Sequence, residues 1–253
     1  MSTPVIETHA LRKVFSRGEG ESLTVLDGLD LAVEAGELVS VLGPTGCGKT
    51  TLLRILAGLE PATDGSVRLA ESAGRSKAGV VFQQSSLLPW RRVLANVAFP
   101  MELAGVPRSP AREKARELLA LVRLEGVERA YPYELSGGMQ QRAAIARALA
   151  TGSDLLLLDE PFGALDDQTR IVLQEVLLEL WRDRRATVLF VTHNIEEALV
   201  LGSRILVLGG GRILDDRKVE LSRPRDRFAP EFVEALVDLR RTFAEAVARV
   251  VAS

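Results

Sequence analysis

The stretch Leu42-Gly43-Pro44-Thr45-Gly46-Cys47-Gly48-Lys49-Thr50-Thr51 decides the fold of this chain, because apolar segments flank it on both sides. Residues 38–42 have the pattern of a short buried strand, and residues 52–56 have the apolar residues of a helix. Three glycines within ten residues are incompatible with a regular strand or helix through the stretch itself. The pattern therefore predicts a strand, a tight loop and a helix, in that order.

The loop fits the pattern G-x-x-x-x-G-K-[ST] of phosphate-binding loops. Backbone N–H groups of such a loop curl around phosphate oxygens, and the helix that follows points its positive end at the anion. We expect Lys49 to reach the β- and γ-phosphates and the Thr50 hydroxyl to bind Mg²⁺. The expected nucleotide-binding residues are Gly43, Pro44, Thr45, Gly46, Cys47, Gly48, Lys49, Thr50 and Thr51. By itself, such a loop fits small-molecule kinases, GTPases and transport ATPases alike.

The composition narrows the class of protein. The chain has 253 residues, of which 47% are hydrophobic and 26% charged, so it can bury a core. A net charge of −2 argues against a nucleic-acid partner, and the single cysteine excludes an intrachain disulfide. There is no signal-peptide pattern and no run of the roughly 18 apolar residues that a membrane-spanning helix needs. We expect a soluble or peripheral chain, and any membrane-spanning part would come from other chains.

Short continuous apolar segments predict the buried parallel strands of an α/β core. They are residues 38–42, 80–82, 155–158, 188–191 and 205–208. Residues 5–41 favour strands, residues 85–150 favour helices, and the three glycines at 209–211 predict a hairpin. Apolar residues at helical spacing predict one more helix in the tail, with a stripe of Phe232, Leu236, Leu239, Phe243, Val247 and Val250. This stripe would pack on its own domain or, alternatively, contact a partner.

A second helix start has the features of an anion site. Ser136 is a plausible N-cap before two glycines and an alanine-rich helix. Acidic residues favour the first turn of a helix, as Glu113 and Asp167 illustrate elsewhere in the chain. The helices after Lys49 and after Ser136 carry no such acid, so we interpret both as open to an anion. A plain Gly-Gly turn before a core helix is the alternative.

These motifs together resemble the ATP-binding-cassette (ABC) ATPase family. Leu135-Ser136-Gly137-Gly138-Met139-Gln140 resembles the family's signature motif, with Met139 where Gln is usual. Gly163-Ala164-Leu165-Asp166 resembles its D-loop, with Gly163 where Ser is frequent. The resemblance implies an α/β P-loop NTPase fold with an N-terminal antiparallel β subdomain and a helical subdomain inserted in the core. The ATPase domain would cover residues 5–225, with the helical subdomain at about 85–150, and residues 226–253 would form a helical tail.

The resemblance also implies a role for each matching side chain. Asp159 would organise Mg²⁺, Glu160 would be the general base for the attacking water, and His193 would contact the γ-phosphate. Gln83 would contact both Mg²⁺ and the water, although Gln84 leaves an ambiguity of one position. The implied catalytic set is Glu160, His193, Lys49 and Gln83, and the implied metal ligands, mostly through water, are Thr50, Gln83 and Asp159.

Three further positions need a separate interpretation. Phe15 is the candidate for stacking on the adenine ring, with a core phenylalanine as the other interpretation. His9 has no catalytic context and is interpreted as an ordinary strand residue. Cys47 lies before a helix and beside Lys49, a setting that tends to lower the pKa of a thiol. The favoured alternative for its natural role is a small residue that fits the loop.

The implied partners and ligands follow from the same resemblance. ATP and Mg²⁺ would be bound, and a second copy would pack head to tail, so that Ser136, Gly137, Gly138 and Gln140 act on the nucleotide of the other copy. Asp166 of the D-loop would touch the partner's site. Membrane permease subunits, and indirectly a solute-binding protein, would complete a transporter, with this chain peripheral at the cytoplasmic face of the membrane. No nucleic-acid partner is expected.

The segment 87–97, with Trp90 as a packed anchor or a docking residue, resembles importer ATPases of the nitrate, sulfonate, taurine and bicarbonate group. The sequences DEPFGALD and VTHNIEEAL point the same way. We therefore expect an ATPase that powers an importer of a small anion such as nitrate, sulfonate or taurine. The alternatives are the ATPase of another importer, an exporter and a soluble regulatory ABC protein. A small-molecule kinase is a further alternative, although the signature motif argues against it.

Overall fold

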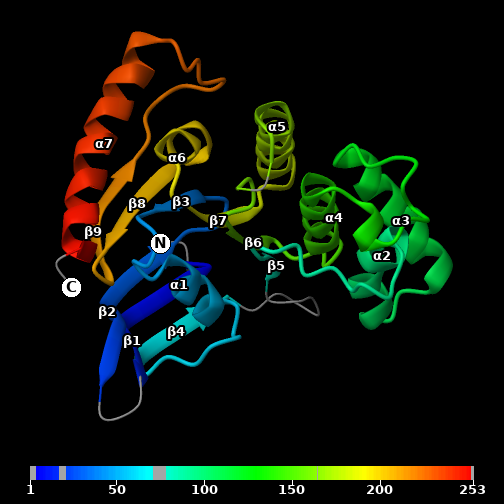
Figure 1. Ribbon diagram of the computed structural model, residues 1–253, viewed down its shortest axis with the longest axis horizontal. Helices are drawn as coiled ribbons and strands as arrows, with labels where there is room; N and C mark the ends of the chain where they lie inside the picture. The colour runs from blue at the N-terminus through cyan, green and yellow to red at the C-terminus, as the bar shows by residue number, and fades with distance from the viewer. Residues whose placement is uncertain (1–3, 17–20, 71–77, 164, 252–253) are drawn as a thin grey trace. The chain divides into compact units, whose positions relative to one another are not determined.

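The computed structural model describes residues 4–16, 21–70, 78–163 and 165–251. The chain forms two compact units, one from Met1–Ala70 with Thr187–Ser253 and one from Glu71–Ala186. Figure 1 labels the helices and strands of both.

The first unit contains an antiparallel sheet and part of the core sheet. β1 (Ile6–Ser16) lies between β2 (Ser22–Val33) and β4 (Asp64–Leu69), antiparallel to both. In the core sheet β3 (Leu38–Leu42) lies between β7 (Thr187–Thr192) and β8 (Arg204–Gly209) and is parallel to both. β9 (Arg212–Lys218) pairs antiparallel with β8, so the predicted hairpin at 209–211 is confirmed.

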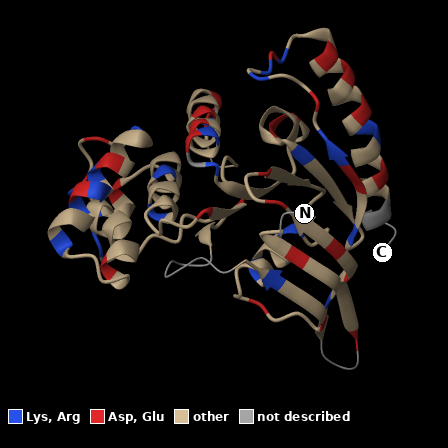
Figure 2. Ribbon diagram, turned by 180° about the vertical axis from the view of Figure 1, so that it is seen from behind, with Lys and Arg blue, Asp and Glu red and all other residues tan. Residues whose placement is uncertain are grey.

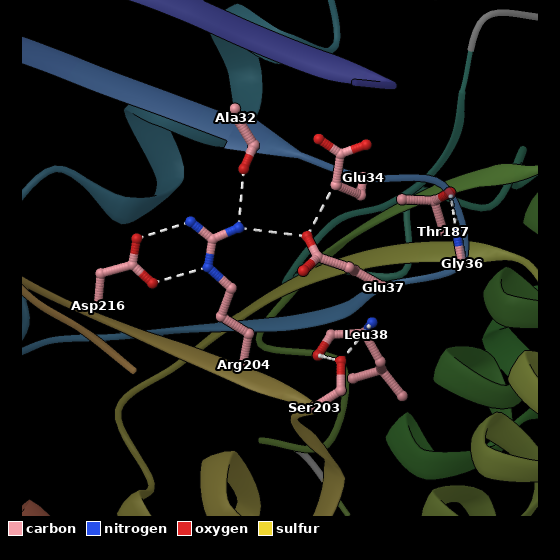
Figure 3. A network of polar contacts seen from close by, with 9 residues as sticks. All are labelled: Ala32, Glu34, Gly36, Glu37, Leu38, Thr187, Ser203, Arg204 and Asp216. Carbon is pink, nitrogen blue, oxygen red and sulfur yellow. Dashed lines mark hydrogen bonds and ion pairs between the residues drawn. The ribbon is translucent and has the colours of Figure 1, made fainter. Parts of the chain in front are cut away.

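An arginine network joins three strands of the first unit. Arg204 on β8 donates to both carboxylate oxygens of Asp216 on β9, at 2.7 and 2.6 Å. Its third nitrogen donates to the carbonyl of Ala32 on β2 at 2.8 Å and to Glu37 at 3.2 Å (Figure 3). Asp216 and then Glu37 raise the pKa of Arg204, which burial alone would lower. The network therefore connects the antiparallel sheet to the core sheet within this unit.

The described residues of the first unit also form the helices α1 (Lys49–Leu56), α6 (Ile195–Leu201) and α7 (Pro230–Val251). α7 runs along β8 and α6 (Figure 1) and buries Phe232, Leu239 and Ala246. The predicted stripe is wrong at Val247, which is 36% exposed, because the close approach of α7 to Gly209 on β8 leaves room only for Ala246. The side chain of Val250 lies outside the described ones.

The second unit holds two parallel strands, β5 (Gly79–Val81) and β6 (Leu155–Asp159). Its helices are α2 (Val93–Leu103), α3 (Arg108–Leu121), α4 (Gly137–Leu149) and α5 (Asp167–Arg184), with a 3₁₀ turn at Pro132–Glu134. Its core is an apolar cluster to which α4, α5 and both strands contribute: Val81, Ile145, Leu149, Leu156, Leu158, Leu173 and Leu177.

The α/β fold class, with an N-terminal antiparallel sheet and a helical region between core strands, is confirmed. All five predicted core strands form, with ends within a residue or two of the apolar segments. The boundaries at 5–225 and 226–253 stay predictions. Among the described residues, the helices are all too short or too polar to cross a bilayer.

Candidate functional site

The loop between β3 and α1 has the backbone that a phosphate loop needs. Gly48, directly before α1, has φ of +103°, and a Cβ there would lie 2.8 Å from the carbonyl oxygen of Val25. Both the dihedral and the lack of space require glycine at this position. α1 has no side-chain cap and no acid in its first turn, which leaves backbone N–H groups at the start of the helix for an anion.

The Lys49 side chain lies inside its own loop. Its ammonium donates to the carbonyl oxygens of Gly43 at 2.8 Å and of Pro44 at 2.9 Å, and the residue is 5% exposed. These hydrogen bonds hold the Lys49 ammonium group inside the loop. The contact of Lys49 with a phosphate stays a prediction, and the position of its ammonium inside the loop is compatible with it.

The expectation of a low thiol pKa at Cys47 is wrong. The residue is 2% exposed and its Sγ packs over Gly43, where an added Cβ would come within 2.5 Å of it. Burial raises the pKa of Cys47 above its ordinary value, although the Lys49 charge and backbone hydrogen bonds lower it in part. Position next to a helix start and a lysine favours a thiolate only where the sulfur reaches solvent.

The first unit brings His193 next to the phosphate loop. Leu42 and Thr192 are register partners on β3 and β7, and the Gly43 N–H donates to the Thr192 carbonyl at 3.4 Å. His193, which is exposed, follows directly. Two motifs about 145 residues apart in sequence thus meet at one edge of the sheet, because parallel strands end at the same edge.

The residues around His193 were not singled out from the sequence. The Asn194 side chain accepts hydrogen bonds from the N–H groups of Glu196 and Glu197 at 2.9 and 3.1 Å. The Thr192 hydroxyl donates to the buried Glu197 carboxylate at 2.7 Å. The Asn194-x-x-Glu197 spacing, which is typical of helix N-termini, is the signal that could have revealed them.

The second unit brings Gln83 next to the acidic pair. Val81 and Leu158 are register partners on β5 and β6, so the residues that follow both strands lie at one edge. The Gln83 side-chain amide donates to the Glu160 carboxylate at 3.4 Å. Asp159 is buried at 3% exposure, whereas Glu160 is half-buried. Because Gln83 makes this contact with Glu160, Gln83 rather than Gln84 is the better candidate for the predicted role.

Glu160 has a backbone that most residues avoid. Its φ is +44°, in the left-handed region, where a residue with a Cβ costs about 1–2 kcal/mol. Such conformations cluster at functional sites. At Gly163, a Cβ would lie 3.8 Å from a Glu160 carboxylate oxygen, an ordinary contact distance, so the loop has room for a Cβ at this position.

The signature residues lie at the start of α4. The Ser136 hydroxyl accepts a hydrogen bond from the Met139 N–H at 3.3 Å, which confirms the predicted N-cap, and both Ser136 and Gly137 are exposed. A Cβ at Gly138 would come within 3.2 Å of Leu165, so the signature packs against the predicted D-loop. Ala164 of that loop lies outside the described residues, and the Asp166 side chain caps α5 by accepting from the Thr169 N–H at 2.9 Å.

The side chain of Gln140 is engaged within its own chain. Its amide nitrogen donates to the carbonyls of Pro132 and Leu135 at 3.0 and 3.2 Å, and its oxygen accepts from the Ser85 hydroxyl at 3.0 Å. Arg147, further along α4, donates to the carbonyl of Ser86 at 2.9 Å. The segment that follows Gln83 is therefore tied to the helix that begins with the signature.

The lack of acidic residues in the first turn does not distinguish the two proposed anion sites, at α1 and α4, from other helix N-termini. α2 and α3 also have no acidic residue in the first turn, since α3 begins at Arg108 and Glu113 comes too late. The N-terminal glycines, the Ser136 cap and the exposure of the signature carry that interpretation instead.

Phe15 and Trp90 are both surface residues. Phe15 on β1 is 36% exposed, and the Lys13 ammonium lies 4.6 Å from the centre of its ring. A core position for Phe15 is therefore wrong. Trp90 is 71% exposed, which excludes a packed anchor within the described chain. His9 lies on β1 with its Nε2 at 3.3 Å from Glu7, as an ordinary strand residue would.

The predicted metal ligands suit Mg²⁺ by their chemistry. Thr50, Gln83 and Asp159 supply hydroxyl, amide and carboxylate oxygens, which are the hard ligands that Mg²⁺ prefers. In the part of the chain that the structure describes, no three His, Cys, Asp or Glu side chains form a metal cluster.

A profile of the family described as "ABC transporter" matches residues 26–163. The chain belongs to the ABC transporter family. It is 49% identical over 205 residues to the taurine import ATP-binding protein TauB of Escherichia coli O157:H7, covering 79% of this chain and 80% of that protein. It is 48% identical over 242 residues to the aliphatic sulfonates import ATP-binding protein SsuB of Mycobacterium sp. (strain MCS), covering 95% of this chain and 93% of that protein.

A solved structure supports the family membership. The dimeric structure of MJ0796, a bacterial ABC transporter cassette, aligns with a TM-score of 0.79 at 34% identity. The alignment covers 86% of this chain and all of that one. The ABC ATPase fold expected from the motifs is therefore confirmed.

Proposed function

We propose that this chain is the ATP-hydrolysing subunit of an ABC importer for taurine or another aliphatic sulfonate. The contact of Gln83 with Glu160, on the strand ends beside the buried Asp159, is the observation that supports hydrolysis rather than binding alone. The importer class and the substrate rest on 45–49% identity to proteins named for taurine and aliphatic sulfonate import.

The proposed mechanism gives each group one task. Loop N–H groups and Lys49 bind the phosphates, and Phe15 stacks on adenine. Glu160 accepts a proton from the attacking water, which Gln83 helps to orient, and His193 contacts the γ-phosphate. Mg²⁺, held by Thr50, Asp159 and water, would neutralise charge that develops on the phosphate oxygens.

The proposed assembly is a head-to-tail dimer. Ser136 and Gly137 are exposed and Gly138 is half-buried, at a helix start that a second copy could present to the nucleotide. MJ0796 is dimeric in its solved structure. In this assembly the direct contribution of the signature comes from Ser136–Gly138, because the Gln140 amide is used within its own chain.

The proposed docking site for the membrane subunit is a groove in the second unit, at the cytoplasmic face of the membrane. The groove has a volume of about 880 Å³, and the exposed Trp90 forms part of its wall. The charged residues that line the groove are two glutamates and six arginines. The arginines are Arg91, Arg92, Arg108, Arg112, Arg116 and Arg129. Figure 2 shows the basic residues on this helical region. This excess of positive charge fits a membrane-subunit segment that carries carboxylates.

The decisive experiment is reconstitution with candidate membrane subunits of a sulfonate importer from the same organism. Taurine or an alkanesulfonate, presented with its solute-binding protein, should stimulate ATP hydrolysis and accumulate in vesicles, whereas nitrate should not. Arg112→Glu should weaken co-purification with the membrane subunits while ATP binding persists, and Arg240→Glu on α7 is the matched control. Stimulation by nitrate alone would contradict the substrate class.

A further inference from the structure

Helix α6, which begins two residues after His193, is too short to be stable by itself. It has seven residues, and isolated helices shorter than about 12–15 residues are marginal in water. The last four carbonyl groups of a helix have no partner within it. Packing on β3 and the Ser40 hydroxyl, which donates to the Ala198 carbonyl at 3.0 Å, hold part of α6. The groups that hold the remaining carbonyls contribute to where α6, and the His193 backbone joined to it, lies.

Two arginines from the segment that follows β9 bind the C-terminal end of α6. Arg225 donates to the carbonyls of Leu199 at 2.5 Å, Val200 at 3.2 Å and Gly202 at 2.7 Å. Arg223 donates to the carbonyls of Val200 at 3.0 Å and of Leu201. The carbonyls of the last helical turn are thus satisfied by side chains about 22 to 26 residues further along the chain.

A third arginine binds the other end of the same helix. Arg227 donates to the carboxylate of Glu196, in the first turn of α6, at 2.7 Å. We call residues 223–227 the arginine strap. It contacts α6 at both ends, and it continues into α7, which also packs against α6.

The charge of the strap suits its place. Cations at the C-terminal end of a helix interact favourably with the helix dipole. Burial, and then the neighbouring Arg223, lower the pKa of Arg225 to about 10, so Arg225 stays protonated at neutral pH. A lysine could keep the charge, but one ammonium group cannot reproduce the planar set of donors that spans several carbonyls.

We propose that the arginine strap positions His193 for the reaction, with Arg225 as its main positioning residue. The proposal rests on the role given above to His193. Asn194 and the Thr192–Glu197 pair fix the N-terminal end of α6, and the strap fixes its C-terminal end. Without the strap, the C-terminal end of α6 keeps only the Ser40 hydrogen bond and its packing on β3 and α7, so that a small shift of α6 carries the His193 backbone with it. Displacements of about 1 Å at a catalytic group can cost about 100-fold in rate.

The test is a double-mutant cycle on steady-state ATPase activity, with Arg225→Ala, His193→Ala and the combination. Arg225→Ala should lower kcat about 10- to 100-fold while ATP affinity stays near that of the unchanged chain. Because both changes remove the same contribution, the double variant should be no slower than His193→Ala. Arg225→Lys should recover only part of the loss, and Arg240→Ala, an exposed arginine of α7, should have no effect.

The outcomes separate the strap from the proposed function. Losses that multiply in the double variant, or normal turnover in Arg225→Ala when His193→Ala is slow, would overturn the strap alone. Normal turnover in His193→Ala would overturn the role of His193 and the strap with it. If Arg225→Ala does not fold, Arg225→Lys and Arg223→Ala provide the same cycle, with thermal unfolding measured beside each rate.

Discussion

The amide nitrogen of Gln83 lies 3.4 Å from a carboxylate oxygen of Glu160, and it donates a hydrogen bond from the end of one strand to the end of its neighbour. The carboxylate is half-buried on a left-handed backbone, directly after the buried Asp159. This geometry fixes the orientation of the carboxylate that we propose as the proton acceptor.

Glu160→Gln should lower ATP turnover by about 10²–10⁴-fold, because the amide cannot accept the proton of the attacking water. That loss corresponds to about 3–5 kcal/mol of activation free energy. ATP should still bind, and the variant should accumulate as an ATP-bound dimer in light scattering. Glu175→Gln, on the exposed face of α5, is the control, and near-normal hydrolysis by Glu160→Gln would refute the assignment of the base.

Lys49→Ala should weaken ATP binding by at least about tenfold, since a charge-assisted hydrogen bond contributes roughly 1.5–3 kcal/mol. The variant also loses the ammonium that bridges the carbonyls of Gly43 and Pro44. Equilibrium binding of a fluorescent ATP analogue measures the effect, with the exposed Lys114→Ala as control. An unchanged dissociation constant would contradict the phosphate-loop interpretation.

Ser136→Arg, introduced into the Glu160→Gln chain, should abolish the ATP-dependent dimer while each subunit still binds ATP. The large side chain would occupy the exposed helix start that the second copy needs, whereas Ser136→Thr keeps the hydroxyl that caps α4. Light scattering with and without ATP distinguishes the two variants. A dimer that persists in the arginine variant would argue against a site shared between copies.

Cys47 should react slowly with iodoacetamide near pH 8, because its raised pKa leaves less thiolate than at an ordinary cysteine. The rate should rise as the pH passes above 9.0, the ordinary value, and the urea-unfolded chain should react faster at every pH below that. Since the folded pKa is the higher one, this thiol favours the folded state below pH 9 and loses that contribution as the pH rises through the folded pKa.

ATP should slow the alkylation of Cys47 further, and complete labelling should block ATP binding, because the sulfur packs against Gly43 inside the loop. Mass spectrometry of the labelled peptide gives the alkylation rates with and without ATP. Equal rates in the folded and unfolded chains would contradict the burial of Cys47.

Much of the fold could be predicted from short segments. The strand–loop–helix around Lys49 and the apolar core strands are local patterns, so each is visible within ten residues of sequence. The order of the motifs likewise identified the family before any contact was known. Cys47 shows the limit of this reasoning, because its neighbours in sequence predict a reactive thiol and its neighbours in space bury it.

The sequence by itself determined the kind of protein: a phosphate loop, a signature helix start and a strand that ends in two acids. Only the tertiary structure decided that Gln83 rather than Gln84 contacts Glu160, and that Ala246 rather than Val247 is buried. It also decided that Arg225 holds the helix after His193. Each of these choices depends on strand register or on helix packing between segments far apart in the chain, which a pattern of neighbouring residues does not contain.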